Sequence, residues 1–188
     1  MPSSFTRAAA VAVSLVAVAG CGGGFALGEP WEPGEARFFD DGVDLMKQPS
    51  KLSGQWAYDQ QQELDGRVTL ADLIAVVEIG SVQTTTDLEG REAKRIEIEI
   101  VEKLYGEKPS DTLSLESNRE SVGYPLVLRH ERHLRGEFIA FLRFFEGEDG
   151  QRAQRFHLSP ASAEMRKLVR EKVEERIEAE QTAANRPI

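Results

Sequence analysis

The chain has 188 residues, of which 40% are hydrophobic and 29% are charged, as in an ordinary globular protein. Its 32 acidic and 23 basic residues give a net charge of −9, which repels a phosphate backbone and argues against a nucleic-acid partner. After the first 20 residues, no apolar run approaches the roughly 20 residues that are needed to span a bilayer.

The first 20 residues have the layout of a signal peptide. Arg7 supplies the positive charge, and residues 8–18 form an apolar run that is too short to cross a membrane. Val18, Ala19 and Gly20 then precede Cys21. This order resembles the lipobox of bacterial lipoproteins, in which an aliphatic and two small residues stand before a cysteine. The resemblance implies that Val18, Ala19 and Gly20 are recognised by the signal peptidase. It also implies that Cys21 is the site of lipid attachment and that palmitate is among the attached acyl chains.

Cys21 is the only cysteine, so the chain has no internal disulfide, and without a lipid an exported chain would carry an orphan thiol. Two alternatives stay open, an ordinary signal peptide followed by a chance cysteine, and a core cysteine. Residues 21–36 are expected to be the lipidated cysteine and a flexible tether, because residues 22–24 are glycines. By resemblance to enteric lipoproteins, glycine at position 22 favours the outer membrane of the envelope, where the bacterium has one.

Residues 37–70 are predicted to form a helical extension of the domain. Asp44 could open a short first helix, and Ser53 is a candidate cap for a second helix. Residues 40–42 are expected to form a turn. The second helix should end near Gly66 and bury the side chains of Trp56 and Leu64.

Residues 71–160 are predicted to be mainly β. The segment from Leu73 to Val82 is nearly all apolar and predicts a buried central strand, while Ile96, Ile98 and Ile100 alternate with charged residues. The shorter strands are expected near residues 113–115, 126–128, 138–144 and 156–158. Five or six strands with no helical pattern between them predict antiparallel pairing in a small barrel or sandwich.

Residues 161–188 are predicted to form a C-terminal amphipathic helix and tail. Ser159 is the expected cap, with Pro160 at the first helical position. One face of the helix carries a continuous apolar stripe, which should cover an open side of the barrel; it consists of Met165, Leu168, Val169, Val173 and Ile177.

Four short motifs give the β region a family resemblance. They are Ala71-Asp72-Leu73-Ile74, Val101 to Gly106, Gly136 to Leu142, and Leu158-Ser159-Pro160. Together they resemble a class of uncharacterised bacterial exported proteins, and residues 37–70 resemble uncharacterised lipoproteins of predatory soil bacteria. The resemblance implies an OB-like barrel, similar to the netrin and tissue-inhibitor-of-metalloproteinases modules, but a fold of this kind does not assign a function.

Two departures limit what that resemblance implies. The metalloproteinase inhibitors chelate zinc through a free N-terminal cysteine and are rich in disulfides, whereas a lipidated Cys21 could not chelate. An oligonucleotide-binding face needs basic and stacking residues, whereas the second strand carries Glu97, Glu99 and Glu102. Zinc inhibition and nucleic-acid binding are therefore not expected.

The histidines are the weak candidates for a metal site. His130 and His133 lie three residues apart, so on a strand they would face opposite sides, and His157 could join them only if the fold brought it close. A polar loop before Gly136 is the preferred interpretation of His130 and His133. Asp40, Asp41 and Asp44 lack the alternation of a calcium loop and are interpreted as turn and cap residues.

The sequence therefore predicts no catalytic residues, no cofactor and no enzyme activity. The favoured hypothesis is a non-enzymatic envelope module, tethered by acyl chains on Cys21, that binds an envelope protein or polymer. The sequence does not distinguish this hypothesis from a structural lipoprotein that has no specific ligand. The alternatives are a protease-inhibitor-like module and an envelope hydrolase with a non-standard site, which requires a pocket where histidine and carboxylates converge with shifted pKa values.

Overall fold

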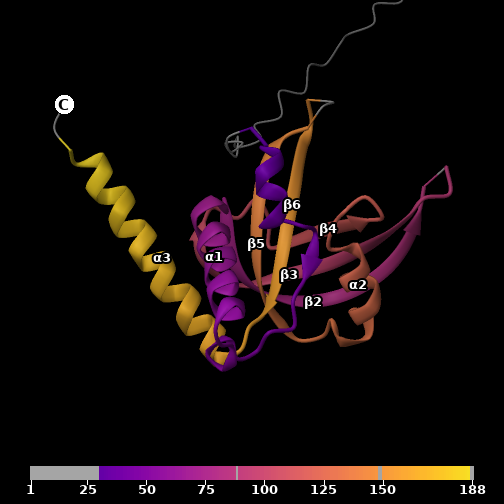
Figure 1. Ribbon diagram of the computed structural model, residues 1–188. Helices are drawn as coiled ribbons and strands as arrows, with labels where there is room; N and C mark the ends of the chain where they lie inside the picture. The colour runs from indigo at the N-terminus through magenta and orange to yellow at the C-terminus, as the bar shows by residue number, and fades with distance from the viewer. Residues whose placement is uncertain (1–29, 88, 148–149, 187–188) are drawn as a thin grey trace, which may run out of the picture.

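A computed structural model describes residues 30–87, 89–147 and 150–186. In these residues one sheet of six strands curls into a half-barrel, and three α-helices accompany it (Figure 1). The strands are β1 (Gly42–Val43), β2 (Leu73–Thr86), β3 (Glu92–Gly106), β4 (Thr112–Asn118), β5 (Glu137–Glu146) and β6 (Arg152–Pro160). The helices are α1 (Gln55–Leu70), α2 (Tyr124–His130) and α3 (Ala163–Ala184), with 3-10 turns η1 (Pro33–Arg37), η2 (Pro49–Lys51) and η3 (Glu131–His133).

The sheet is mixed, with the strand order β1-β6-β5-β2-β3-β4. The four pairings among β2 to β6 are antiparallel, and β1 pairs with β6 in parallel. The mainly-β prediction is therefore confirmed. The prediction of purely antiparallel pairing fails at this edge, because a short piece of the N-terminal extension joins the sheet there.

The two central strands, β2 and β5, are buried on both faces, as the apolar run of β2 predicted. Ala75, Val77 and Ala140 face the interior of the half-barrel, where Val127 of α2 and Leu134, the residue after η3, pack against them. On the outer face, Ile74, Ile139 and Phe141 pack against α1 and α3. Hydrophobic burial on both faces makes these two strands the centre of the fold.

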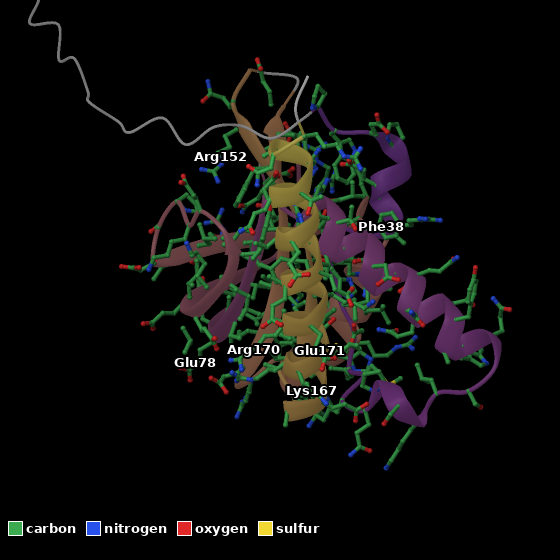
Figure 2. All side chains as sticks on the ribbon, turned by 90° about the vertical axis from the view of Figure 1, so that its left-hand side faces the viewer. Phe38, Glu78, Arg152, Lys167, Arg170 and Glu171 are labelled. Carbon is green, nitrogen blue, oxygen red and sulfur yellow. The ribbon has the colours of Figure 1, made fainter. Side chains whose placement is uncertain are left out.

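The C-terminal helix begins three residues later than expected. Ser162, and not Ser159, is the N-cap, and its hydroxyl accepts a hydrogen bond of 3.1 Å from the amide of Met165. Pro160 is the last residue of β6, so β6 continues through the predicted cap. The predicted apolar stripe is confirmed, since Met165, Val169 and Val173 are buried in contact with α1 and the sheet. Figure 2 looks onto the solvent side of this helix.

The segment before Gly136 is helical, contrary to prediction. Residues 126–128 belong to α2 and not to an edge strand, and the predicted polar loop of His130 and His133 is the end of α2 followed by η3. The helix is anchored because Tyr124 and Val127 are buried. A run of seven residues is too short for its helical period to stand out in the sequence.

The second predicted helix is confirmed as α1, but it ends at Leu70 and not near Gly66, and two further details are wrong. Gly54 precedes it without a side-chain cap, so Ser53 does not have the predicted role. Leu64 is buried as predicted, whereas the side chain of Trp56 is 75% exposed. The short helix expected after Asp44 is replaced by η2, which starts five residues later. In the described part of the chain, no helix is long and apolar enough to cross a membrane.

Candidate functional site

The polar face of β6 is the best candidate for a functional site. Phe156 and Leu158 point into the half-barrel, so the alternation of the strand turns Arg155, His157 and Ser159 to the other side. The segment around β1 runs beside this face, with the amide of Asp41 bonded to the carbonyl of Phe156 at 2.9 Å and the amide of Asp44 bonded to the carbonyl of Leu158 at 2.9 Å. These backbone bonds bring three aspartates onto three polar side chains of β6.

His157 lies between two of these aspartates. Its Nδ1 is 2.8 Å from an oxygen of Asp40, and its Nε2 is 3.1 Å from an oxygen of Asp44. The hydroxyl of Ser159 donates to the same Asp44 oxygen at 2.6 Å. The histidine is 3% exposed, so both carboxylates satisfy a ring that water barely reaches. We call Asp40, Asp41, Asp44, Arg155, His157 and Ser159 the buried cluster.

The pKa values of the histidine and its two carboxylates shift in opposite directions. Burial alone would lower the pKa of His157, as would the charge of Arg67, but the hydrogen bonds that its ring makes to Asp40 and Asp44 outweigh both and raise it. Burial alone would raise the pKa of Asp40 and of Asp44, but the hydrogen bond and charge of His157 outweigh it and lower both. The arrangement therefore favours a charged imidazolium between two charged carboxylates.

Asp41 occupies the turn into β1 and binds the neighbouring arginine. Its backbone has a φ of 52°, in the left-handed region that aspartate tolerates better than most residues. Its carboxylate pairs with Arg155, accepts a bond of 2.9 Å from the hydroxyl of Ser121, and accepts one of 3.2 Å from the amide of Phe156. Burial is the largest influence on the pKa of Asp41 and raises it despite these donors.

Arg67 connects the buried cluster to α1. Its Nε donates to the carbonyl of Phe38 at 3.2 Å, and its NH2 donates to Glu63 at 3.0 Å. Its NH1 lies 3.9 Å from an oxygen of Asp44 and is buried without a hydrogen-bond partner in the described part of the chain. This arginine therefore adds a second buried positive charge beside the aspartates.

A second buried network fastens η1 to the sheet. Arg143 of β5 binds Glu35 of η1 at 3.2 Å and Asp72 at 3.0 Å. Asp72 in turn accepts the amide of Phe144 at 2.7 Å. Together with the buried cluster, this network ties the segment from η1 to β1 to β5 and β6 by charged contacts.

The chemistry of the buried cluster suits fastening and not catalysis. Both ring nitrogens of His157 are occupied by carboxylates, so neither is available as a base toward a substrate or a serine hydroxyl. The rings of His130 and His133 lie 6.1 Å apart at the end of α2 and in η3. Across residues 30–87, 89–147 and 150–186, no group of three or more histidine, cysteine, aspartate or glutamate residues has the geometry of a metal site.

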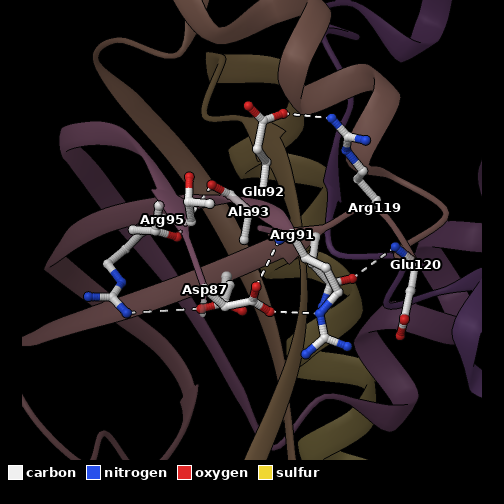
Figure 3. A pocket seen from close by; sticks show the side chains of 11 residues that line it. Asp87, Arg91, Glu92, Ala93, Arg95, Arg119 and Glu120 are labelled. Carbon is white, nitrogen blue, oxygen red and sulfur yellow. Dashed lines mark hydrogen bonds and ion pairs between the residues drawn. The ribbon is translucent and has the colours of Figure 1, made fainter. Parts of the chain in front are cut away.

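A hollow in the described surface lies beside the turn between β2 and β3 and is shown in Figure 3. It has a volume of about 610 Å³ and is lined by threonines of β2 and by charged residues from the turn, from β3, and from β4 and the residues that follow it. Arg91 pairs with Asp87 at 2.7 Å, and Arg119 pairs with Glu92 at 2.7 Å. Arg95 also lies 4.0 Å from Glu116, so each lining arginine is paired with a lining carboxylate, and Glu120 is left as a single excess negative charge that gives little basis for selecting a ligand.

The sequence-predicted site residues have different outcomes. Val18, Ala19, Gly20 and Cys21 lie outside the described residues. Among the histidines, His157 belongs to the buried cluster, whereas His130 and His133 lie near each other in another part of the chain. The aspartates at 40, 41 and 44 were expected only in turn and cap roles, but they also bind His157 and Arg155 of β6. In the sequence, Arg155, His157 and Ser159 alternate with Phe156 and Leu158. This alternation is the signal that could have identified a polar face of β6.

Comparison with known proteins does not place the chain in a family. No model of a protein family matches it, and no curated protein matches it with significant similarity.

Proposed function

We propose that this chain is a lipid-anchored protein of the bacterial cell envelope whose folded domain is a non-catalytic binding or structural module. The observation that carries the proposal is the run Val18-Ala19-Gly20-Cys21, which follows an apolar segment and contains the only cysteine. Acyl chains on Cys21 would hold the protein on the membrane, in the outer membrane where the bacterium has one. The partner of the module is an envelope protein or polymer and not a nucleic acid.

We further propose that strands β2 to β6 form an OB-like barrel, which is a partly open Greek-key barrel of five strands. Three observations support this. β2 pairs with both β3 and β5, β4 and β6 lie at the two ends of this five-strand run, and α2 lies between β4 and β5 in the chain. The end strands approach each other, because Gln154 of β6 donates to the carbonyl of Ser114 of β4 at 2.6 Å.

The buried cluster counts against the alternative of an envelope hydrolase. Histidine and carboxylates with shifted pKa values do converge at His157, as that hypothesis requires. The convergence is buried, however, and both nitrogens already have carboxylate partners. A protease-inhibitor-like module that acts through a free Cys21 would be excluded by the lipid itself.

The anchor is tested by metabolic labelling with palmitate in a bacterial host, followed by mass spectrometry of the purified protein. We expect label in the parent and a mature chain that begins at an acylated Cys21. Cys21→Ser should abolish labelling, whereas the matched control Gly24→Ser should retain it. An unlabelled parent, a bare thiol on Cys21, or equal labelling of Cys21→Ser would each refute the proposal.

A further inference from the structure

The end of α2 and the segment around η3 carry positive charges that have no acidic partner among the described residues. Arg129, Arg132 and Arg135 are exposed, and none of them forms an ion pair with a described residue. The acidic residues nearest in sequence are both engaged by other cations. Glu131 binds Lys94 at 2.7 Å, and Glu137 binds Arg166 at 2.6 Å. In a chain with a net charge of −9, this local excess of positive charge is an exception.

Lys47 and His133 extend this charged region across a hollow. A depression of about 480 Å³ is lined by Lys47, His133 and Arg135 together with Leu45, Phe138 and other residues. Lys47 follows β1, so the depression lies between the N-terminal segment and the end of η3. We call Lys47, Arg129, Arg132, His133 and Arg135 the basic face.

Exposed aliphatic side chains lie on the same segments as these cations. On α2, Leu126 is 39% exposed and Leu128 is 50% exposed, and Val122, just before the helix, is 75% exposed. Leu45, which lines the hollow, is 39% exposed. Cations interleaved with aliphatic side chains are typical of surfaces that rest on a membrane interface. A surface for single-stranded nucleic acid would instead present aromatic side chains for stacking.

We propose that the basic face and these aliphatic side chains form a docking surface for a bilayer that contains anionic phospholipids. Lys47 and the three arginines, which form no ion pair with a described residue, complement phosphate headgroups, and the leucines can enter the boundary between headgroups and acyl chains. Helix α2, which carries Arg129, lies on the side of the sheet opposite α1 and α3 (Figure 1), and the hollow beside Lys47 extends to Ser162, the N-cap of α3. The opposite side presents α3, whose exposed cations have acidic partners.

The biological setting of this docking surface rests on the proposed lipid anchor. An anchor on Cys21 would place the domain within nine residues of the membrane, a reach of at most about 30 Å to Pro30. A single weak electrostatic contact holds a protein poorly, whereas an acyl anchor and a basic surface together hold it stably. The docking surface would then fix the orientation of the domain against the bilayer.

The experiment uses the full chain with Cys21→Ser, so that no lipid is attached and the anchor does not contribute. Its partition is measured on vesicles of phosphatidylcholine alone and of phosphatidylcholine with phosphatidylglycerol. We expect tighter binding to the anionic vesicles, and the difference should shrink as salt is added. Replacing Arg129, Arg132 and Arg135 with Gln should reduce anionic binding by at least about tenfold, since each basic residue near such a surface contributes several-fold.

A matched control removes the same number of charges from the opposite side. Lys167, Arg170 and Lys172 of α3 form ion pairs with Glu171, Glu102 and Asp65, and Figure 2 shows Lys167 and Arg170 on its solvent side. Replacing these three with Gln changes the net charge equally and should leave anionic binding within about twofold of the parent. Circular dichroism and a urea midpoint show whether each variant folds like the parent.

Several results would overturn the proposal. They are equal binding to neutral and anionic vesicles, a triple arginine variant that binds like the parent, or a control that loses as much binding as that variant. Self-association that disappears in the arginine variant, without any preference for anionic vesicles, would assign the basic face to a second copy of the chain instead. None of these results bears on palmitate labelling, so failure of the docking surface and failure of the anchor are distinguishable.

Discussion

The buried cluster and the basic face both contain histidine and arginine, but they place these side chains in opposite environments. In the buried cluster, His157 lies between Asp40 and Asp44 and is almost completely removed from water, while the partly exposed Arg155 pairs with the buried Asp41. In the basic face, His133 and its neighbouring arginines remain exposed and are without acidic partners among the described residues. A cation that is buried must be paired to be tolerated, whereas an exposed unpaired cation is free to attract a partner. The comparison therefore separates a structural fastening from a candidate docking surface.

The largest expected effect of a substitution follows from removing the cation of the buried cluster. His157→Leu leaves Asp40 and Asp44 facing each other with no charge between them, and a buried pair that loses one partner costs about 3–5 kcal/mol. Urea unfolding should show this loss of stability. The triple glutamine variant of Arg129, Arg132 and Arg135 should unfold at nearly the parent's midpoint, because no buried group loses a partner.

The control for this prediction removes the stranded charges as well. Asp40→Asn and Asp44→Asn combined with His157→Leu should recover part of the lost stability, since no unpaired charge then remains in the interior. If His157→Leu alone is as stable as the parent, the histidine is not the fastening described here, and the comparison between the two regions fails.

A smaller effect is expected where the two regions touch. The amide of Gly123, just before α2, donates to the carbonyl of Asp40 at 2.7 Å, and a Cβ on Gly123 would lie 2.2 Å from the Cα of Gly42. Gly123→Ala must therefore push α2 away from β1. Overpacking of this kind costs about 1–3 kcal/mol in stability.

The same substitution tests whether the buried cluster positions the basic face. We expect Gly123→Ala to lower the urea midpoint and to weaken binding to anionic vesicles, because α2 carries Arg129. Gly34→Ala is the matched control, since an added Cβ there meets no atom within 4 Å. An equal loss of stability in both variants would show that the close approach of Gly123 to Gly42 is not responsible.

The sequence was informative about strands and poor about the contacts between segments. The apolar run of β2 and the alternation of β3 predicted those strands because burial follows directly from the pattern along one element. Ser162 and not Ser159 caps α3, because Ser159 pairs with Ile139 in β6, where its hydroxyl donates to Asp44. That contact joins residues 115 positions apart, so no local pattern reveals it.

The candidate site was hidden from sequence reasoning for the same reason. His157 was grouped with His130 and His133 by residue type, but its ligands are aspartates of the N-terminal segment. Those aspartates resembled an ordinary turn, which Asp41 does occupy with its positive φ. Only the pairing of β1 with β6 shows that the turn and the histidine belong together.

The pH dependence of stability offers the finest test of the buried cluster. The folded pKa of His157 is raised, so its contribution to stability is fully present below the unfolded pKa of about 6.5 and is lost as the pH rises through the folded value. The folded pKa values of Asp40 and Asp44 are lowered. Their contribution is present above about pH 4 and is lost as the pH falls through their folded values. The cluster should stabilise the fold most between about pH 4 and 6.5.

Urea unfolding of the parent and of His157→Gln, measured from neutral pH upward, isolates the histidine. One proton contributes at most about 1.4 kcal/mol per pH unit, so the parent should lose stability with up to that slope relative to the variant. Asp41, whose pKa burial raises, has the opposite sign to Asp40 and Asp44 on the acid side. Asp41 is present in both the parent and His157→Gln, so to first order it does not affect the difference between their stabilities. Parallel stability curves for the two chains would mean that His157 carries no charge between its carboxylates, and the buried cluster would then be a neutral hydrogen-bond network.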